Sequence, residues 1–301
     1  MIDIKYHIAS IVAVFLALGL GILIGSTIVG DELLVDQQKK ILDRLENQFE
    51  MIREREVDLV LDNEYKTELI SNYENYSLAL LPPLVQDRLN EEKIAVVVTG
   101  NTDIPSGLVN SITIAGAQVV SKTVVLSNLK LSDNEVNSKL LDYYNIEETE
   151  DFRDILRKNI AGSVTAVLLN QGDQGIMEFL QESDVINFTG SFDEPISKVI
   201  ILGGTNSLET YFAKSFDQSL IENLINGGIK VFGVEKSSAV HSYMADYQEN
   251  NITTIDNIDM SPGQVGLVFA MEGEPGNYGI KSTAEKFMPS LPVNFLGSEA
   301  R

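Results

Sequence analysis

Histidine and methionine carry the main metal-binding chemistry of this 301-residue sequence, because the chain has no cysteine. His241 and Met244 are three positions apart, a spacing that places two side chains on one face of a helix. Cu(I) favours a thioether ligand, and Cu(II) favours an imidazole together with oxygen ligands such as Asp246. The pair is a candidate metal site, although a structural role on the surface is the more common use of two such residues.

The sequence lacks common catalytic motifs, since it contains neither G-x-S-x-G nor H-E-x-x-H. The absence of cysteine also excludes disulfides, thiolate metal sites and cysteine nucleophiles. The second histidine, His7, adjoins an apolar segment and is expected to anchor it at a membrane interface. The sequence therefore predicts a protein that is not an enzyme and that holds no cofactor.

Residues 8–30 form an apolar segment without Asp, Glu, Lys or Arg. A helix needs roughly 20 residues to cross a bilayer, whereas the apolar part of a signal peptide has about 7–15 and ends in a small-x-small cleavage site. We therefore expect a retained single-pass anchor. Lys5 precedes the segment, and the positive-inside tendency favours a short cytoplasmic segment at residues 1–7 with the C-terminal part outside the cell membrane.

A stripe of small residues recurs every fourth position along this segment, at Ala9, Ala13, Ala17, Gly21 and Gly25. At 3.6 residues per turn they share one face, along which two membrane helices can approach closely. Alanine and glycine are also common in membrane helices generally. The uninterrupted spacing favours a packing face, and a helix dimer is its simplest use.

Residues 31–81 are rich in charge and free of glycine and proline, which predicts a long helical stalk. Leu45, Ile52 and Leu59 are seven residues apart, the spacing of a coiled-coil seam, and a parallel dimer is favoured over a folded-back hairpin. The pair Pro82-Pro83 is expected to end the helix. Other apolar residues near the seam are Leu34, Ile41 and Leu69. Four polar residues interrupt the seam: Gln48, Arg55, Asp62 and Lys66.

Residues 82–301 are predicted to form a mostly parallel, three-layer α/β domain outside the membrane. Short apolar runs alternate with helix-length segments, as expected for buried strands covered on both faces. The expected strands are 93–100, 118–126, 164–169, 198–202, 230–234 and 252–255, and the expected helices are 105–116, 152–160, 207–225 and 239–249.

Three polar, glycine-containing loops follow expected strands, at residues 99–102, 170–173 and 203–207. Ligands of parallel sheets bind at the carboxyl ends of strands, so these loops are candidates for a binding site. None has the G-x-G-x-x-G or Walker pattern, and ordinary strand-to-helix turns are favoured over a phosphate cradle.

The net charge of −22 lies entirely within residues 31–301, because Asp3 and Lys5 cancel in the first thirty. A field of this sign repels nucleic acid and anionic headgroups, so nucleic acid is not an expected partner. A solvated acidic surface is the simplest interpretation, and a surface that gathers cations is the alternative.

The first thirty residues resemble the opening of the bacterial MctB-type copper transporter family, in the run His7-Ile-Ala-Ser-Ile-Val-Ala-Val-Phe-Leu-Ala-Leu-Gly-Leu-Gly-Ile-Leu-Ile-Gly-Ser26. The C-terminal part is similar to that family's ending, in Ser261-Pro-Gly-Gln-Val-Gly-Leu-Val-Phe-Ala, Gly276-Asn-Tyr-Gly279 and Ala284-Glu-Lys-Phe-Met-Pro289. The resemblance implies a role in copper homeostasis or transport at the cell envelope, with copper as a transported or sensed ion. Relatives are also associated with cell-division complexes.

Two functional hypotheses follow. One, from the resemblance, is a membrane-anchored envelope protein of copper homeostasis or transport. The other is a non-catalytic dimeric envelope scaffold, or a cell-division-associated protein, that binds envelope proteins through its stalk and outer domain. The expected partners are the lipid bilayer, a second copy of the chain in a parallel dimer through the membrane helix and stalk, and envelope proteins.

Overall fold

The computed structural model of the protein describes residues 4–100, 102–172 and 174–290, and the side chains of these except at 27–34 and 174. The chain divides into two compact units between Ser71 and Asn72. The first is helical, and the second contains the last turns of the long helix together with an α/β domain.

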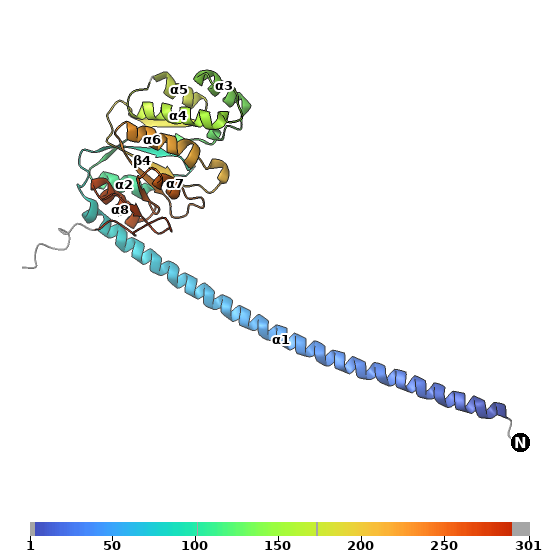
Figure 1. The fold of residues 1–301 in the computed structure, drawn as a ribbon. Helices are drawn as coiled ribbons and strands as arrows, with labels where there is room; N and C mark the ends of the chain where they lie inside the picture. The colour runs from blue at the N-terminus through green and yellow to red at the C-terminus, as the bar shows by residue number, and fades with distance from the viewer. Residues whose placement is uncertain (1–3, 101, 173, 291–301) are drawn as a thin grey trace, which may run out of the picture. The chain divides into compact units, whose positions relative to one another are not determined.

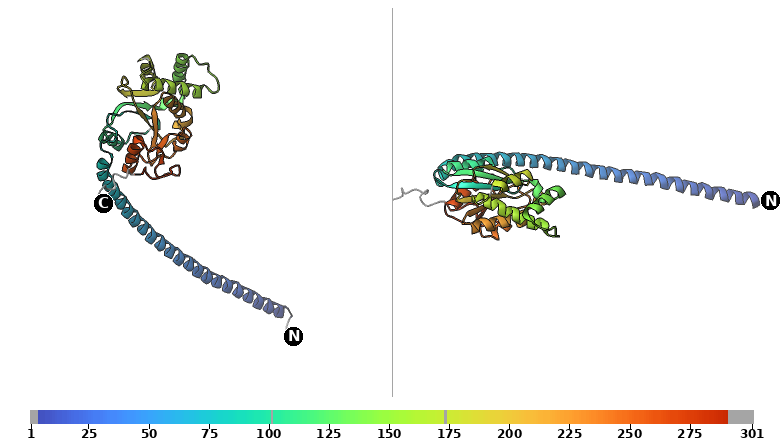
Figure 2. Two further views of the ribbon diagram at one scale, coloured as in Figure 1. Left: turned by 60° about the vertical axis from the view of Figure 1, so that its left-hand side comes forward. Right: turned by 90° about the horizontal axis from the view of Figure 1, so that it is seen from above.

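Helix α1 (Ile4–Val85) is one uninterrupted helix, and the ribbon views draw it without a break (Figures 1 and 2). Its first 23 residues, Ile4–Ser26, form the one stretch of the described chain that is long and apolar enough to cross a membrane, and none of the apolar window is buried. The side chains at residues 27–30 of the expected segment lie outside the described part. Because the helix does not reverse, the folded-back hairpin does not form.

The expectation that Pro82-Pro83 ends the helix is wrong, because α1 continues to Val85. Proline lacks an N–H and costs about 3 kcal/mol inside a helix. Here both prolines are exposed on the outer side, while Leu81 and Val85 are 3% and 0% exposed in the hydrophobic core. Burial of this i, i+4 pair holds the final turn in helical form despite the prolines.

A seven-stranded sheet forms the centre of the domain, with the strand order β3-β2-β1-β4-β5-β6-β7. All neighbouring strands are parallel except β2 and β3. This confirms the mostly parallel α/β domain. The strands are β1 (Lys93–Val98), β2 (Gln118–Val125), β3 (Ile186–Gly190), β4 (Lys198–Gly203), β5 (Lys230–Glu235), β6 (Thr253–Ile255) and β7 (Asn277–Tyr278).

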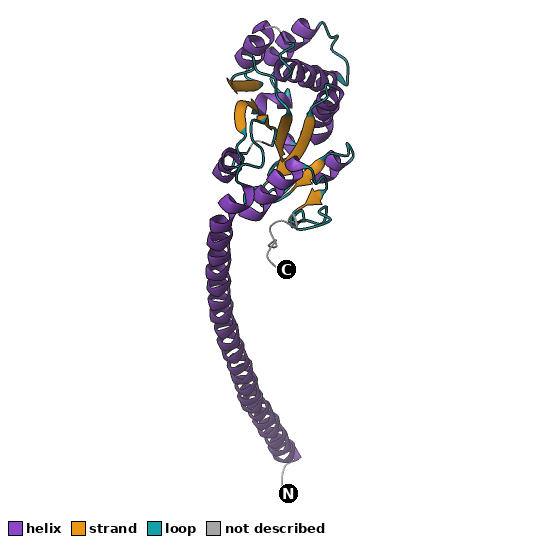
Figure 3. Cartoon of the chain, turned by 90° about the vertical axis from the view of Figure 1, so that its left-hand side faces the viewer, coloured by secondary structure: helices purple, strands orange, loops and turns teal. Residues whose placement is uncertain are grey.

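Helices cover both faces of the sheet, as Figure 3 shows with the strands between them. Alternate side chains of β1 enter two different hydrophobic clusters: Ala95 and Val97 contribute to one, and Ile94 and Val96 to the other. Because successive side chains point to opposite faces and both faces are buried, β1 is apolar throughout. The first face carries α3 (Asn134–Tyr144), α4 (Phe152–Leu168), α5 (Gln174–Glu182), α6 (Gln218–Asn226) and α7 (Met244–Gln248), and the second carries α2 (Ser106–Ile114), α8 (Ser261–Glu272) and the end of α1.

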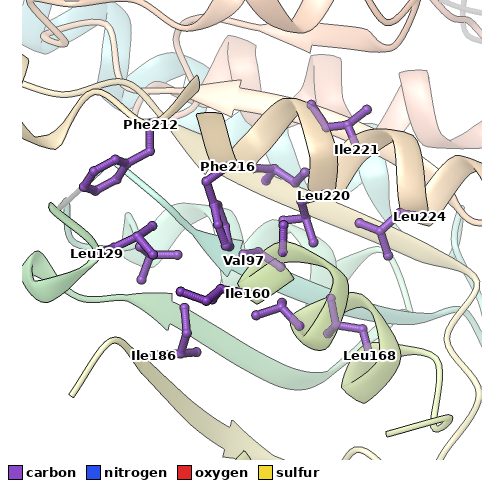
Figure 4. Close-up of a cluster of buried hydrophobic side chains, with 14 of the residues drawn as sticks. Val97, Leu129, Ile160, Leu168, Ile186, Phe212, Phe216, Leu220, Ile221 and Leu224 are labelled. Carbon is purple, nitrogen blue, oxygen red and sulfur yellow. The ribbon is translucent and has the colours of Figure 1, made fainter. Parts of the chain in front are cut away.

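The segment Val164–Leu169, expected to be a strand, is instead the end of helix α4. Its buried residues continue the three- and four-residue spacing of Leu156 and Ile160, so one apolar face runs along the whole helix. Figure 4 shows Ile160 and Leu168 in the cluster with Leu220 and Leu224 of α6. A short apolar run cannot distinguish a buried strand from one turn of a buried helix.

Two expected helices are shorter than predicted. Residues 207–225 hold a 3₁₀ turn at Leu208–Thr210, a π-helix at Ala213–Asp217 and then α6. Residues 239–249 are helical only in α7. Several elements were not expected from the sequence, among them the antiparallel strand β3 and helix α8, whose residues are buried on nearly every side. An apolar stretch without amphipathic period gives no helix signal.

Candidate functional site

A small pocket lies at the carboxyl ends of β1, β4 and β5, with a volume of about 110 Å³. Gly100 and Thr102 after β1 line it, together with residues 203–207 after β4 and with Lys236 and Ser238 after β5. Because β2 and β4 lie on opposite sides of β1, the strand order reverses here, the usual location of ligands in open α/β sheets.

Two of the three candidate loops therefore meet at one site, those at residues 99–102 and 203–207. The third, at 170–173, does not belong to it, because it follows helix α4 rather than a strand. Asn101 and Asp173 of these loops lie outside the described residues.

Glycines allow the loops to approach each other at the pocket. A Cβ atom on Gly100 would lie 1.9 Å from the carbonyl oxygen of Gly204, a distance no side chain tolerates. Gly204 also has φ +77°, in the left-handed region, and a Cβ there would lie 2.8 Å from Cβ of Ala239. The close main-chain contact between the β1 and β4 loops therefore requires glycine at position 100, and the backbone conformation and the nearby Ala239 require it at position 204.

Hydroxyl groups form much of the polar lining. The Thr205 and Thr210 hydroxyls are 2.6 Å apart and share a hydrogen bond, and Thr205 Oγ1 accepts one from the Ser207 N–H at 3.2 Å. Asn206 Oδ1 accepts a hydrogen bond from the Val240 N–H at 3.2 Å. These bonds hold the 203–207 loop in a defined conformation at the rim of the pocket.

Beside the pocket, a fully buried carboxylate ends strand β5. Glu235 Oε1 accepts hydrogen bonds from Lys281 Nζ at 2.7 Å and Ser242 Oγ at 2.6 Å, and Oε2 accepts one from the Tyr243 N–H at 2.9 Å. Lys281 Nζ also donates to the carbonyl oxygen of Ala239 at 3.1 Å. The charge of Glu235 is therefore compensated, and the pair connects the loop after β5 to the C-terminal segment.

A second buried carboxylate, that of Asp217, is hydrogen-bonded to the residue that follows β1. Asp217 Oδ2 accepts hydrogen bonds from Thr99 Oγ1 at 2.7 Å and from the Tyr247 hydroxyl, whereas Oδ1 has no partner within the described chain. Burial raises the pKa of Asp217 to about 6, because desolvation disfavours the charged form, although the hydrogen bonds from Tyr247 and Thr99 oppose this. Burial likewise raises the pKa of Tyr247 well above its usual value.

Sequence reasoning did not find Lys236, Glu235, Lys281 or Asp217. For Lys236 and Glu235 a signal existed, since both stand at the carboxyl end of the expected strand 230–234. For Lys281 and Asp217 there was none, because only the fold brings them to this edge of the sheet.

His241 and Met244 do not share a helix face, contrary to the expectation. His241 is half-buried in an extended bridge, in which its N–H donates to the carbonyl oxygen of Thr205 at 2.8 Å and its carbonyl accepts from the Thr205 N–H at 3.1 Å. Met244 begins α7 and is 1% exposed within the hydrophobic core. The helix was expected to begin at residue 239, and its later start separates the pair.

Metal-binding side chains are dispersed elsewhere too. Within the described residues, no three side chains of histidine, aspartate or glutamate are grouped closely enough to hold a metal ion. Copper coordination by His241 and Met244 remains a prediction that the geometry does not favour, because the sulfur is buried among apolar groups.

The small-residue stripe is exposed along its described length, since Ala9, Ala13, Ala17, Gly21 and Gly25 all have exposed positions on α1. A Cβ atom added to Gly21 or Gly25 would meet nothing within 4 Å. The single chain therefore gives no steric reason for glycine at these two positions.

Nearly the whole chain matches a known protein family. The family model described as copper transport outer membrane protein, MctB, matches residues 1–289. The chain belongs to the MctB family. No curated protein is significantly similar to the chain. The MctB match confirms the resemblance expected from residues 7–26 and 261–289, and with the apolar helix it associates the protein with a membrane and with copper transport.

Proposed function

We propose that this chain is a single-pass protein of the cell membrane that acts in copper homeostasis or transport as a parallel dimer, and that it is not an enzyme. One observation carries the proposal: helix α1 continues without a break from an exposed apolar span into a stalk that ends in the α/β domain. The MctB match supports the copper-related role. The outer domain then lies on the far side of the membrane from residues 1–7.

The stalk supports dimerisation because its seam is uncovered in the single chain. Leu45, Ile52 and Leu59 are 44%, 61% and 63% exposed at seven-residue spacing. Asp62 and Lys66, which occupy core-type positions, form an i, i+4 ion pair of 2.6 Å on their own helix. Burying the apolar residues against a second copy would remove about 1.5–3 kcal/mol of unfavourable exposure for each fully covered side chain.

Copper transport then depends on what the dimer assembles at the membrane. The one apolar helix found among the described residues has no lumen, so a pore requires several copies or a partner protein. In this arrangement the outer domain positions or regulates the assembly and does not carry copper itself. The dispersed histidine and carboxylate side chains are consistent with that division of roles.

A scaffold for envelope proteins is the second candidate, and exposed aromatic residues near the end of the stalk favour it. Tyr65, Tyr73 and Tyr76 are 65%, 67% and 65% exposed. Tyrosine is enriched where proteins bind one another, because its ring is apolar and its hydroxyl tolerates water. A cell-division complex is one setting in which such a scaffold would act.

The copper role is tested by deleting the gene and measuring cellular copper by mass spectrometry. We expect copper content and copper tolerance to change, and to return to normal with the full chain but not with one lacking residues 1–30. Unchanged copper in the deletion strain, together with loss of envelope partners of the tagged protein, would favour the scaffold instead.

The topology is tested by adding protease to intact protoplasts. Residues 31–301 should be degraded while a tag on residues 1–7 survives, because the membrane separates that tag from the protease. Complete protection of the C-terminal domain would contradict the proposed orientation.

A further inference from the structure

The pocket at the ends of β1, β4 and β5 has the chemistry of an anion site. Lys236 supplies its one charged group among the described lining residues, none of which has a carboxylate, imidazole or thioether. Lys236 Nζ forms no hydrogen bond or ion pair with any residue that the structure describes. The ammonium is therefore available to a ligand.

Nearby carboxylates are already occupied by other donors. Glu235 is paired with Lys281 at 2.7 Å, and Asp259 accepts hydrogen bonds from the Ser237 N–H and hydroxyl, both at 2.7 Å. Asp217 is fully buried, with hydrogen bonds from Thr99 and Tyr247. In a chain with 44 acidic and 22 basic residues, Lys236 is thus an unpaired positive charge among the described residues that line the pocket.

Free hydroxyls complete the set of donors. Thr102 and Ser238 line the pocket from two different loops, and neither hydroxyl has a hydrogen-bond partner within the described chain. With Lys236 they present donors from the β1 and β5 loops, opposite the ordered loop after β4. An ammonium and hydroxyls carried by separate loops suit a tetrahedral oxyanion, whose oxygens point in several directions, better than a planar carboxylate.

The size of the pocket limits the ligand. A volume of about 110 Å³ is well below the roughly 300 Å³ of the smallest pockets that enclose drug-sized molecules. It holds a group of a few non-hydrogen atoms. Three of its lining residues, Gly100, Gly203 and Gly204, contribute main chain and no side chain.

We propose that this pocket binds a phosphate group, held by the Lys236 ammonium and by the Thr102 and Ser238 hydroxyls. Lysine binds phosphate as a point charge. The site lies at the reversal of strand order, where phosphate-bearing ligands of α/β sheets are bound, although the loop lacks the glycine fingerprint of dinucleotide sites. The proposal is independent of the copper role, since the pocket offers no copper ligand.

Calorimetric titration of the full chain in detergent with inorganic phosphate tests the proposal. We expect saturable binding, weakened about tenfold or more by Lys236→Met, because one charge-assisted hydrogen bond is lost. The matched control Lys158→Met removes an exposed charge from α4, outside the pocket, and should change the affinity by no more than about twofold. No saturation by about 10 mM phosphate, or equal losses in both variants, would overturn the proposal.

Two further arms complete the experiment. Glycerol phosphate that binds more tightly than inorganic phosphate identifies a phosphomonoester as the ligand, and equal binding identifies free phosphate.

Should circular dichroism show that Lys236→Met does not fold, Ser238→Ala decides the question, because the Ser238 side chain is exposed and its removal leaves the core intact. A loss of about threefold supports the site, and unchanged affinity refutes it.

Discussion

The carboxylate of Glu74 in α1 binds the first residue of α8: its Oε1 accepts hydrogen bonds from the Ser261 N–H at 3.1 Å and from the Ser261 hydroxyl at 3.0 Å. Ser261 is completely buried. A carboxylate at a helix N-terminus satisfies an orphan N–H and interacts favourably with the helix dipole. These two hydrogen bonds thus connect the last turns of α1 to the start of α8 in the α/β domain.

Replacing Glu74 with alanine should lower the free energy of unfolding by about 1–2 kcal/mol, because a buried helix N-terminus loses its acceptor. Denaturant unfolding of the full chain in detergent, followed by circular dichroism, measures the loss. Glu64→Ala is the control, since Glu64 is exposed on α1. Equal stability of the two variants would show that the Glu74 contact contributes nothing.

The membrane helix should lose its dimer contact when Gly21 and Gly25 are both changed to isoleucine. In the single chain a Cβ atom added at either position meets nothing within 4 Å, so we attribute a loss of crosslinking to the facing helix of a second copy. Crosslinking between stalks in membranes should fall several-fold. The control, Leu16→Ile with Leu23→Ile, alters the other side of the helix. Unchanged crosslinking in the glycine variant would mean that the stripe reflects composition alone.

Asp217 should make the protein less stable as the pH rises from about 4 to 6. Its pKa in the folded chain is raised by burial from an ordinary 3.8 to about 6, so the folded state binds more protons than the unfolded state in this window. The stabilising proton is fully present near pH 4 and is lost above pH 6. Over that range the contribution falls by about 3 kcal/mol.

Thermal unfolding of the wild type and of Asp217→Asn at several pH values measures this effect. Asparagine cannot ionise, so the variant should gain stability relative to the wild type as the pH rises through this window. Asp103→Asn, at an exposed position, serves as the control. A constant difference between Asp217→Asn and the wild type at every pH would contradict the assignment.

Copper binding should not depend on His241. Its main chain pairs with Thr205, and the sulfur of its expected partner Met244 is buried in the core. We expect the full chain to bind Cu(I) no more tightly than a peptide with one histidine and one methionine, because nothing completes the ligand set. Competition against a Cu(I) chelator measures the affinity. Sub-nanomolar binding that disappears in His241→Ala would show the pair to be a true site.

The sequence pattern alone was sufficient to predict those elements whose structure depends on residues close together in the chain. The uncharged stretch at residues 8–30 predicts an apolar helix, because the hydropathy of its own residues identifies it, and the apolar part of α1 is found at Ile4–Ser26. The continuous apolar runs of β1 and β4 predict buried parallel strands, since both of their faces need cover. The loops after these strands were correctly expected at a common edge, because parallel strands end on the same side.

Tertiary structure alone decided the rest. Thr99 and Asp217 are 118 residues apart, and Glu235 and Lys281 are 46 apart, so no local period connects them. Only the strand order β2-β1-β4-β5 brings these groups to one edge of the sheet. The same packing determined that Val164 and Leu168 belong to a helix and that α1 continues through two prolines, because burial in a shared core outweighs local propensity.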